Sequence, residues 1–161
     1  MLISSLIAAL LLATPPAMPV PPGELEVDPY EMSNENAGAT PIRDPRLFEA
    51  FGGVDGISRI VDDMVERSVA DPRIADIFRA SDLVRLRRTL KEQFCYLLGG
   101  PCDYTGRTMR DSHVDHGITN AEFNALVENL QLAMDAEGVP FRAQNRLLAL
   151  LAPMQRDIVT R

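Results

Sequence analysis

The sequence of 161 residues is poor in aromatic side chains and contains no tryptophan, only two cysteines and only two histidines. Two cysteines cannot build the disulfide framework of a small secreted scaffold, so a packed apolar core must hold the fold together. Basic residues are outnumbered, 16 against 23 acidic ones, and the net charge of -7 argues against a nucleic-acid partner. Phosphate-binding P-loops, dinucleotide-binding glycine motifs and zinc-type sets of Cys and His are also missing.

The sequence also lacks an apolar run long enough to span a membrane. Residues 2–13 are apolar but fall short of the roughly 20 residues that a spanning helix needs. Their length fits the core of a signal peptide, and Ala13 and Ala17 fit a cleavage site, although no Lys or Arg precedes the run. We therefore predict a signal peptide over residues 1–17, export to the periplasm or the exterior, and only transient membrane contact. A membrane anchor and a cytoplasmic protein remain alternatives.

Basic and periodic apolar residues are scarce up to residue 45. Residues 1–45 hold 8 of the 12 prolines and carry a net charge of -5, against -2 for residues 46–161. A proline-rich, acidic segment buries too little apolar surface to offset the entropy lost on ordering. We predict a disordered linker over residues 18–45 and a single folded domain over residues 46–161.

The domain shows no extended alternation of apolar and polar residues, so strands are not expected. Apolar residues instead recur three and four positions apart, which predicts an all-α fold with four main helices. The pair Ser81-Asp82 is the predicted N-cap of the second helix, and Thr119 is that of the third. The apolar repeats that define these helices cover residues 57–69, 83–97, 123–134 and 141–158.

Two connections do not fit a plain helical bundle. Residues 72–78 are too short for a full helix, yet Ile74, Ile77 and Phe78 are expected to point inward. Residues 99–117 form a long connection punctuated by glycines. Both histidines, His113 and His116, lie in the second connection. A connection of that length inside a compact domain is usually functional or carries a short helix of its own.

Several motifs occur in a fixed order along the domain, and together they resemble the truncated haemoglobins, most closely their first group. The resemblance implies a two-over-two helical globin sandwich with a short proximal helix and a haem cofactor with its iron. Neither cysteine belongs to a haem-attachment motif, so the haem would be non-covalent haem b. The motifs are FEAFGG at residues 48–53, GGP at 99–101, YTG at 104–106 and M-x-x-x-H-x-x-x-GIT at 109–119.

The resemblance implies roles for individual residues. His113 matches the proximal histidine that binds the haem iron through a neutral imidazole. Phe78 matches a phenylalanine that packs on the haem face. Arg85 would pair with a haem propionate or belong to a solvated charged face, and His116 would contact a propionate or solvent. The remaining haem contacts expected from the resemblance are Leu86, Leu90, Phe94 and Met109.

The sequence departs from the family's pattern above the iron. Oxygen-handling members carry a tyrosine and a glutamine where this chain has Val65 and Leu90, and ordinary globins carry a histidine at the position of Leu86. A hydrogen bond to charged oxygen contributes on the order of 1.5–3 kcal/mol. Its loss should speed oxygen dissociation roughly ten- to a hundred-fold, since about 1.4 kcal/mol is a factor of ten. CO and NO should be comparatively favoured.

Three functions remain open. The first is a haem protein that reversibly binds oxygen, NO or CO in carriage, scavenging or sensing. The second is an enzyme, a NO dioxygenase or a peroxidase-like protein, which would need a reductase; we rank it lower because such chemistry benefits from the missing distal donors. The third is a haem-free helical module that acts through protein contacts.

The two cysteines allow two interpretations. Cys95 ends the second predicted helix and Cys102 follows the Gly-Gly-Pro turn, so an exported protein could join them in a disulfide. The alternative, which we slightly favour, is two unrelated residues with Cys95 simply buried.

Overall fold

The computed structural model describes residues 19–161, so the predicted signal peptide lies outside the described range. Regular structure within this range is entirely helical, as predicted. No helix of the described part of the chain is both long and apolar enough to cross a membrane. The elements are η1 (Asn34–Ala37), α1 (Pro45–Ala50), α2 (Gly53–Ala70), α3 (Ala75–Arg79), α4 (Leu83–Leu97), α5 (Met109–His113), α6 (Asn120–Ala136), α7 (Phe141–Leu151), η2 (Ala152–Met154) and α8 (Gln155–Ile158).

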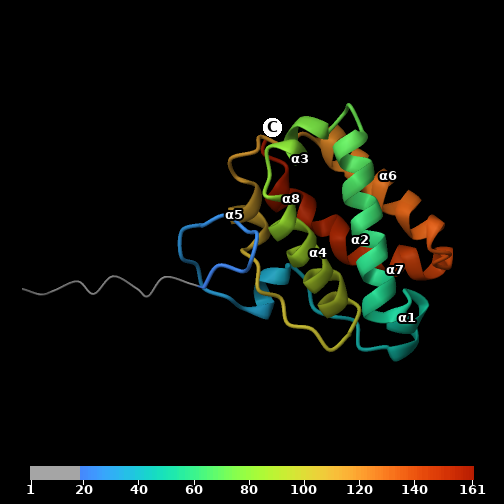
Figure 1. The fold of residues 1–161 in the computed structure, drawn as a ribbon. Helices are drawn as coiled ribbons and strands as arrows, with labels where there is room; N and C mark the ends of the chain where they lie inside the picture. Colours follow the sequence, from blue (N-terminus) through green and yellow to red (C-terminus); the bar gives the residue numbers. More distant parts are fainter. Residues whose placement is uncertain (1–18) are drawn as a thin grey trace, which may run out of the picture.

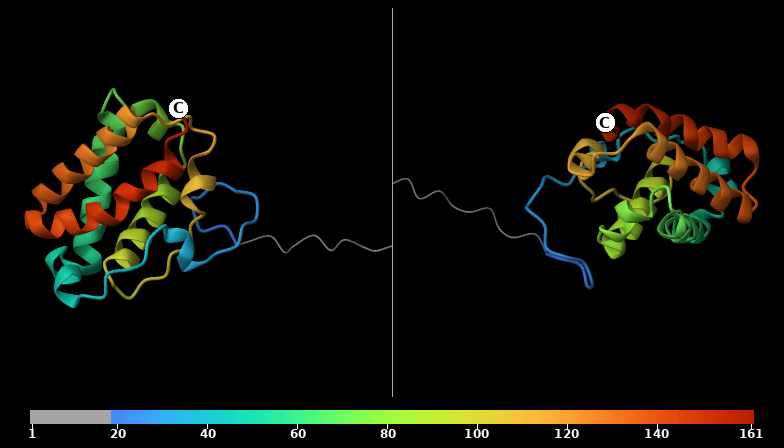
Figure 2. Two further views of the ribbon diagram at one scale, coloured as in Figure 1. Left: turned by 180° about the vertical axis from the view of Figure 1, so that it is seen from behind. Right: turned by 90° about the horizontal axis from the view of Figure 1, so that it is seen from above.

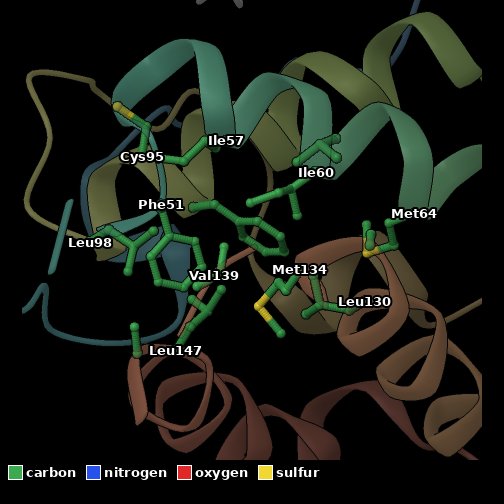
Figure 3. Close-up of a cluster of buried hydrophobic side chains, with 14 of the residues drawn as sticks. Phe51, Ile57, Ile60, Met64, Cys95, Leu98, Leu130, Met134, Val139 and Leu147 are labelled. Atoms are coloured by element: carbon green, nitrogen blue, oxygen red, sulfur yellow. The ribbon is translucent and has the colours of Figure 1, made fainter. Parts of the chain in front are cut away.

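The longest helices form two layers, α2 with α4 and α6 with α7, and α2 also packs on α6 (Figures 1 and 2). This arrangement confirms the predicted all-α sandwich. The main core lies between the layers, where the apolar stripes of the helices meet and are removed from water. Its largest buried side chains include Phe51, Ile57, Ile60, Met64, Leu98, Leu130, Met134 and Leu147 (Figure 3).

Local sequence signals fix where the helices begin and end. Asp82 caps α4 by accepting hydrogen bonds from the backbone N–H groups of Val84 and Arg85. Thr119 caps α6 through a capping box with Glu122, so both predicted N-caps are confirmed. The fourth apolar repeat does not form one continuous helix. Pro153 lacks the backbone N–H that a helix interior needs, and the chain passes through η2 before α8.

The long connection from residue 99 to residue 117 begins with a tight turn. Gly99 has a φ of 79°, and a Cβ there would meet the backbone oxygen of Ile42 at 2.5 Å, so only glycine fits. The turn brings the Cα atoms of Cys95 and Cys102 to 5.8 Å, and the two residues form a disulfide. Our preference for unpaired cysteines is therefore corrected. The far end of the connection carries the short helix α5.

The structure differs from the predicted disordered linker, because residues 19–45 lie against the domain. Residues 19–33, which we call the N-terminal strap, form the blue loop beside α4 and α5 (Figures 1 and 2). They lead into η1, where Ala37 is fully buried, and the backbone N–H of Ile42 then donates to the carbonyl of Leu97. Individual polar contacts order this segment. A prediction of disorder from amino-acid composition does not take such contacts into account.

Candidate functional site

A cavity of about 400 Å³ opens between α3 and α4 on one side and α5 and α6 on the other. Its volume lies within the range of roughly 300–1,000 Å³ that is typical of small-molecule sites. The interior is mainly hydrocarbon, as such sites usually are. Apolar side chains that line it include Ile74, Ile77, Phe78, Leu86, Leu90, Phe123 and Leu126.

Most of the predicted site residues lie on the wall of this cavity. They come from α3, α4, α5 and the turn after α5, which are separated in sequence and brought together by the fold. The predicted residues that line the cavity are Phe78, Arg85, Leu86, Leu90, Met109, His113 and His116.

Two predicted pocket residues, Val65 and Phe94, are buried in the main core and do not line the cavity. Phe94 lies eight residues after Leu86 on α4. Each step of four residues turns a helix by about 40°, so two such steps carry the side chain well away from the cavity face. Val65 is fully buried within α2, in the core cluster against which Leu86 packs.

Gln93 lines the cavity and was missed by the sequence reading. It lies seven residues after Leu86, and seven residues make nearly two full helical turns, so it stays on the same face. The spacing of seven residues from Leu86 could therefore have predicted that Gln93 lines the cavity. Gln93 is buried, and its Nε2 donates to the backbone carbonyl of Ala37 at 2.9 Å.

His113 is the only imidazole of the described residues that is held by a short backbone contact. Its Nδ1 lies 2.6 Å from the carbonyl oxygen of Met109. A carbonyl only accepts, so Nδ1 carries the proton and Nε2 keeps its lone pair. Burial lowers the pKa of His113 below its ordinary value, which favours the neutral ring. His116 is exposed, with its ring centroid 6.5 Å from that of His113.

The hydroxyl and amide groups along the cavity wall all donate to backbone carbonyls. The hydroxyl hydrogens are therefore engaged within the protein. The amide of Gln93 has two hydrogens, and besides the Ala37 carbonyl its Nε2 contacts the sulfur atoms of Met109 and Met154, which are weak acceptors. The wall formed by Leu86 and Leu90 offers no donor. The donors and their acceptors are Tyr30 with Thr105, Ser81 with Ile77, Thr89 with Arg85, Gln93 with Ala37, Tyr104 with Arg107 and Ser112 with Thr108.

A helical sandwich with a histidine on the wall of an apolar cavity is the arrangement expected of a small globin. Residues 46–160 match the sequence model of the family described as bacterial-like globin. This chain belongs to the bacterial-like globin family. It is 31% identical over 114 residues to the group 1 truncated haemoglobin GlbN of Mycolicibacterium paratuberculosis, and the match covers 71% of this chain and 84% of that protein.

Solved structures support the same truncated globin fold. The truncated haemoglobin of Tetrahymena pyriformis superposes with a TM-score of 0.68 at 24% identity, over 71% of this chain and 98% of that one. The 2/2 haemoglobin of a Synechococcus species gives a TM-score of 0.65 at 25% identity, also over 71% and 98%, and was solved with covalently attached haem in the cyanomet state.

Membership in this family implies haem and its iron, and the residues of this globin fit such a group. The imidazole of His113 presents Nε2, the nitrogen that a metal needs. Phe78 and Met109 supply apolar surface in the same cavity. Arg85 lies at the edge of the cavity, and its Nε donates to the carboxylate of Glu24, 3.0 Å away.

Proposed function

We propose that this truncated haemoglobin holds haem b non-covalently through His113 and reversibly binds a diatomic gas. The observation that carries the proposal is the Nδ1–H of His113 held by the Met109 carbonyl on the wall of an apolar cavity. Bound haem would supply an iron atom with a coordination position for the gas. The polypeptide supplies the imidazole, fixes its tautomer and keeps water away.

Each of these contributions belongs to particular residues. The Met109 carbonyl orients the ring of His113 and makes it a better ligand, as an acceptor on the second nitrogen generally does. Phe78 and Met109 line the cavity with hydrocarbon, which excludes water. Leu86 and Leu90 continue the same hydrocarbon lining along α4.

The preference for one gas over another depends on whether a side chain of the cavity wall can donate a hydrogen bond to the bound gas. Leu86 and Leu90 have none, and the hydroxyl and amide groups nearby donate to backbone carbonyls. A ligand that depends on a hydrogen bond, as oxygen does, would be released quickly. We infer a preference for NO or CO and poor oxygen storage. The enzymatic alternative gains no support from this wall; NO consumption by the oxygenated protein, with a reductase added, would argue for it.

An absorption spectrum of the purified protein, ferric and then ferrous with CO, tests haem binding. We expect a Soret band after one equivalent of haem is added, and a CO-shifted band after reduction. The His113→Ala variant is the matched control and should lose the ligated spectrum. Acidic organic solvent should extract the haem completely if attachment is non-covalent. A wild-type spectrum identical to free haem would overturn the proposal.

We also propose that the protein is exported. The disulfide between Cys95 and Cys102 supports this, because disulfides persist in oxidising compartments and are rare in the cytosol. The expected result is a mature chain without residues 1–17 and without free thiols, measured by intact mass with thiol labelling of protein from its own cells. Free thiols on a chain that still starts at Met1 would argue for the cytoplasm.

A further inference from the structure

The N-terminal strap has little structure of its own and is held mainly by contacts to the rim of the cavity. One backbone hydrogen bond lies within residues 19–33, from the N–H of Glu24 to the carbonyl of Pro21. Of the strap's large apolar side chains, Val20, Leu25 and Met32 are exposed, Leu25 by 67%, whereas Tyr30 is half-buried under the guanidinium of Arg107. Opening the strap would therefore disturb little apolar packing, and the polar contacts decide whether it stays closed.

The strongest of these contacts is made by Glu24. Its side chain is 1% exposed and lies between two arginines of α4. Oε2 accepts from Nε of Arg85 at 3.0 Å and from Nη2 of Arg88 at 2.9 Å, and Oε1 accepts from Nε of Arg88. The hydrogen bond from Arg88 is the main cause that holds the pKa of Glu24 below its ordinary value. A carboxylate buried in this way is costly to separate from its partners.

The contact continues into the wall of the cavity. Arg88 also donates to Glu92 and to the hydroxyl of Thr105, and Glu92 accepts from the backbone N–H of Thr105. The carbonyl of Thr105 accepts from Tyr30, a strap residue that lines the cavity. The charge cluster thus joins the strap, α4 and the connection after the disulfide at one place on the rim.

Arg85 links the cluster to the cavity interior, because its side chain lines the cavity while its Nε and Nη2 donate to the strap at Glu24 and Leu25. In the closed arrangement, the positive charges of Arg85 and Arg88 are balanced by Glu24 and Glu92. Release of Glu24 leaves this rim one unit more positive. A haem molecule, which carries two carboxylates, would be attracted to the rim in that open arrangement.

We propose that the N-terminal strap is a lid over the cavity, latched by Glu24 on Arg85 and Arg88, and that it must unlatch for haem to enter or leave. This inference rests on the proposed haem-binding function. A latch raises the barrier in both directions, so it changes the rates of haem uptake and loss by similar factors and leaves the affinity nearly unchanged.

The test compares Glu24→Gln with Glu26→Gln, a matched change at an exposed strap residue. Three measurements are made on the full chain: haem uptake by stopped flow, haem loss to excess apomyoglobin, and hydrogen exchange of residues 19–33. We expect Glu24→Gln to speed uptake and loss roughly ten-fold or more each, since hydrogen bonds between charged groups are the strong ones. It should also speed exchange in the strap but not in α4. Glu26→Gln should leave all three unchanged.

Other outcomes overturn the latch. Faster loss with unchanged uptake would mean that Glu24 only holds Arg85 in place for bound haem. Slower loss would mean that Glu24 competes with a haem carboxylate for Arg85. Unchanged rates would mean that the strap is not a barrier. If the wild-type protein takes up no haem, the proposed function fails, and hydrogen exchange still decides whether Glu24 fastens the strap.

Discussion

At the residue scale, the few polar side chains on the mainly hydrocarbon cavity wall matter most, because they already donate within the protein. Thr89 and Gln93 are polar and lie beside Leu86 and Leu90, yet both donate to backbone carbonyls. A donor is useful to a bound ligand only when its hydrogen is not already engaged. The preference for a gas therefore depends on which side chains have a hydrogen left to give.

Leu90→Gln should restore such a donor. Leu90 lines the cavity, and an amide there would reach the cavity interior from the position where the family's oxygen-handling members carry glutamine. We expect oxygen dissociation to slow roughly ten- to a hundred-fold, because a hydrogen bond to a charged acceptor contributes on the order of 1.5–3 kcal/mol. Laser photolysis or stopped-flow dissociation measures the rate, and CO dissociation should change much less.

Leu90→Met is the matched control, because it keeps the volume and adds no donor. An equal slowing in both variants would show that packing, and not hydrogen bonding, sets the rate. Oxygen dissociation from the wild type as slow as in a tyrosine-containing relative would contradict the donor-poor pocket itself.

The carboxyl group of Glu24 gives a prediction about pH. The charged groups around it are Arg85, Arg88, Glu92 and Asp82, all on α4 or at its cap, and the hydrogen bond from Arg88 is the main cause that lowers the pKa of Glu24. With a lowered pKa in the closed form, the latch is complete above the ordinary glutamate range and is lost as the pH falls through the lowered pKa.

A carbon NMR titration of the Glu24 carboxyl measures this directly. We expect a midpoint below the ordinary value of 4.5, and Arg88→Gln should raise it toward that value. A midpoint at or above the ordinary value in the wild type would show that the ion pair does not form in solution.

At the element scale, α4 illustrates what the sequence could and could not predict. Its limits were predictable, because Asp82 at the start and Gly99 after the end are strong local signals. It was harder to predict which residues of α4 face the cavity and which face the core. The family resemblance suggested Phe94 for the cavity, whereas the helical rotation places Phe94 in the core and Gln93 at the cavity. Polarity hid Gln93, since a pattern of apolar residues cannot register a buried amide.

The disulfide ties the end of α4 to the connection that carries part of the cavity wall. The Cys95→Ser/Cys102→Ser variant should be less stable by about 2 kcal/mol, because closing even a short loop removes entropy from the unfolded chain. Urea unfolding followed by circular dichroism measures this loss.

Reduction of the wild-type protein should produce the same loss, and reductant should not affect the double serine variant. Equal stability of the oxidised, reduced and variant proteins would show that the disulfide does not constrain the folded domain. Loss of all helical signal in the variant would mean that the disulfide contributes far more than the loop entropy.

At the scale of the whole molecule, the docking of the strap could not be read from the sequence. The partners of Glu24 lie 61 and 64 positions away, and a single sequence does not reveal which charges pair over such distances. The four main helices, in contrast, follow from local periodicity that each segment carries by itself. Long-range polar contacts are thus the part of this fold that needed a structure.

Haem should stabilise the whole domain, because a ligand that binds only the folded chain shifts the unfolding equilibrium. With free haem at 100 times its dissociation constant, the gain is about 2.7 kcal/mol. For a chain of this length the gain raises the melting temperature by roughly 5–11 °C. Thermal unfolding with and without haem, followed by circular dichroism, measures the shift.

Two variants distinguish the role of the iron ligand from that of the latch in this measurement. His113→Ala removes the imidazole held by Met109, so its shift at the same haem concentration should be much smaller. Glu24→Gln should keep nearly the full shift, because a latch alters the rates of haem exchange and leaves the affinity almost unchanged. A full shift in His113→Ala would show that another group binds the iron. A lost shift in Glu24→Gln would mean that Glu24 acts on the affinity and is no latch.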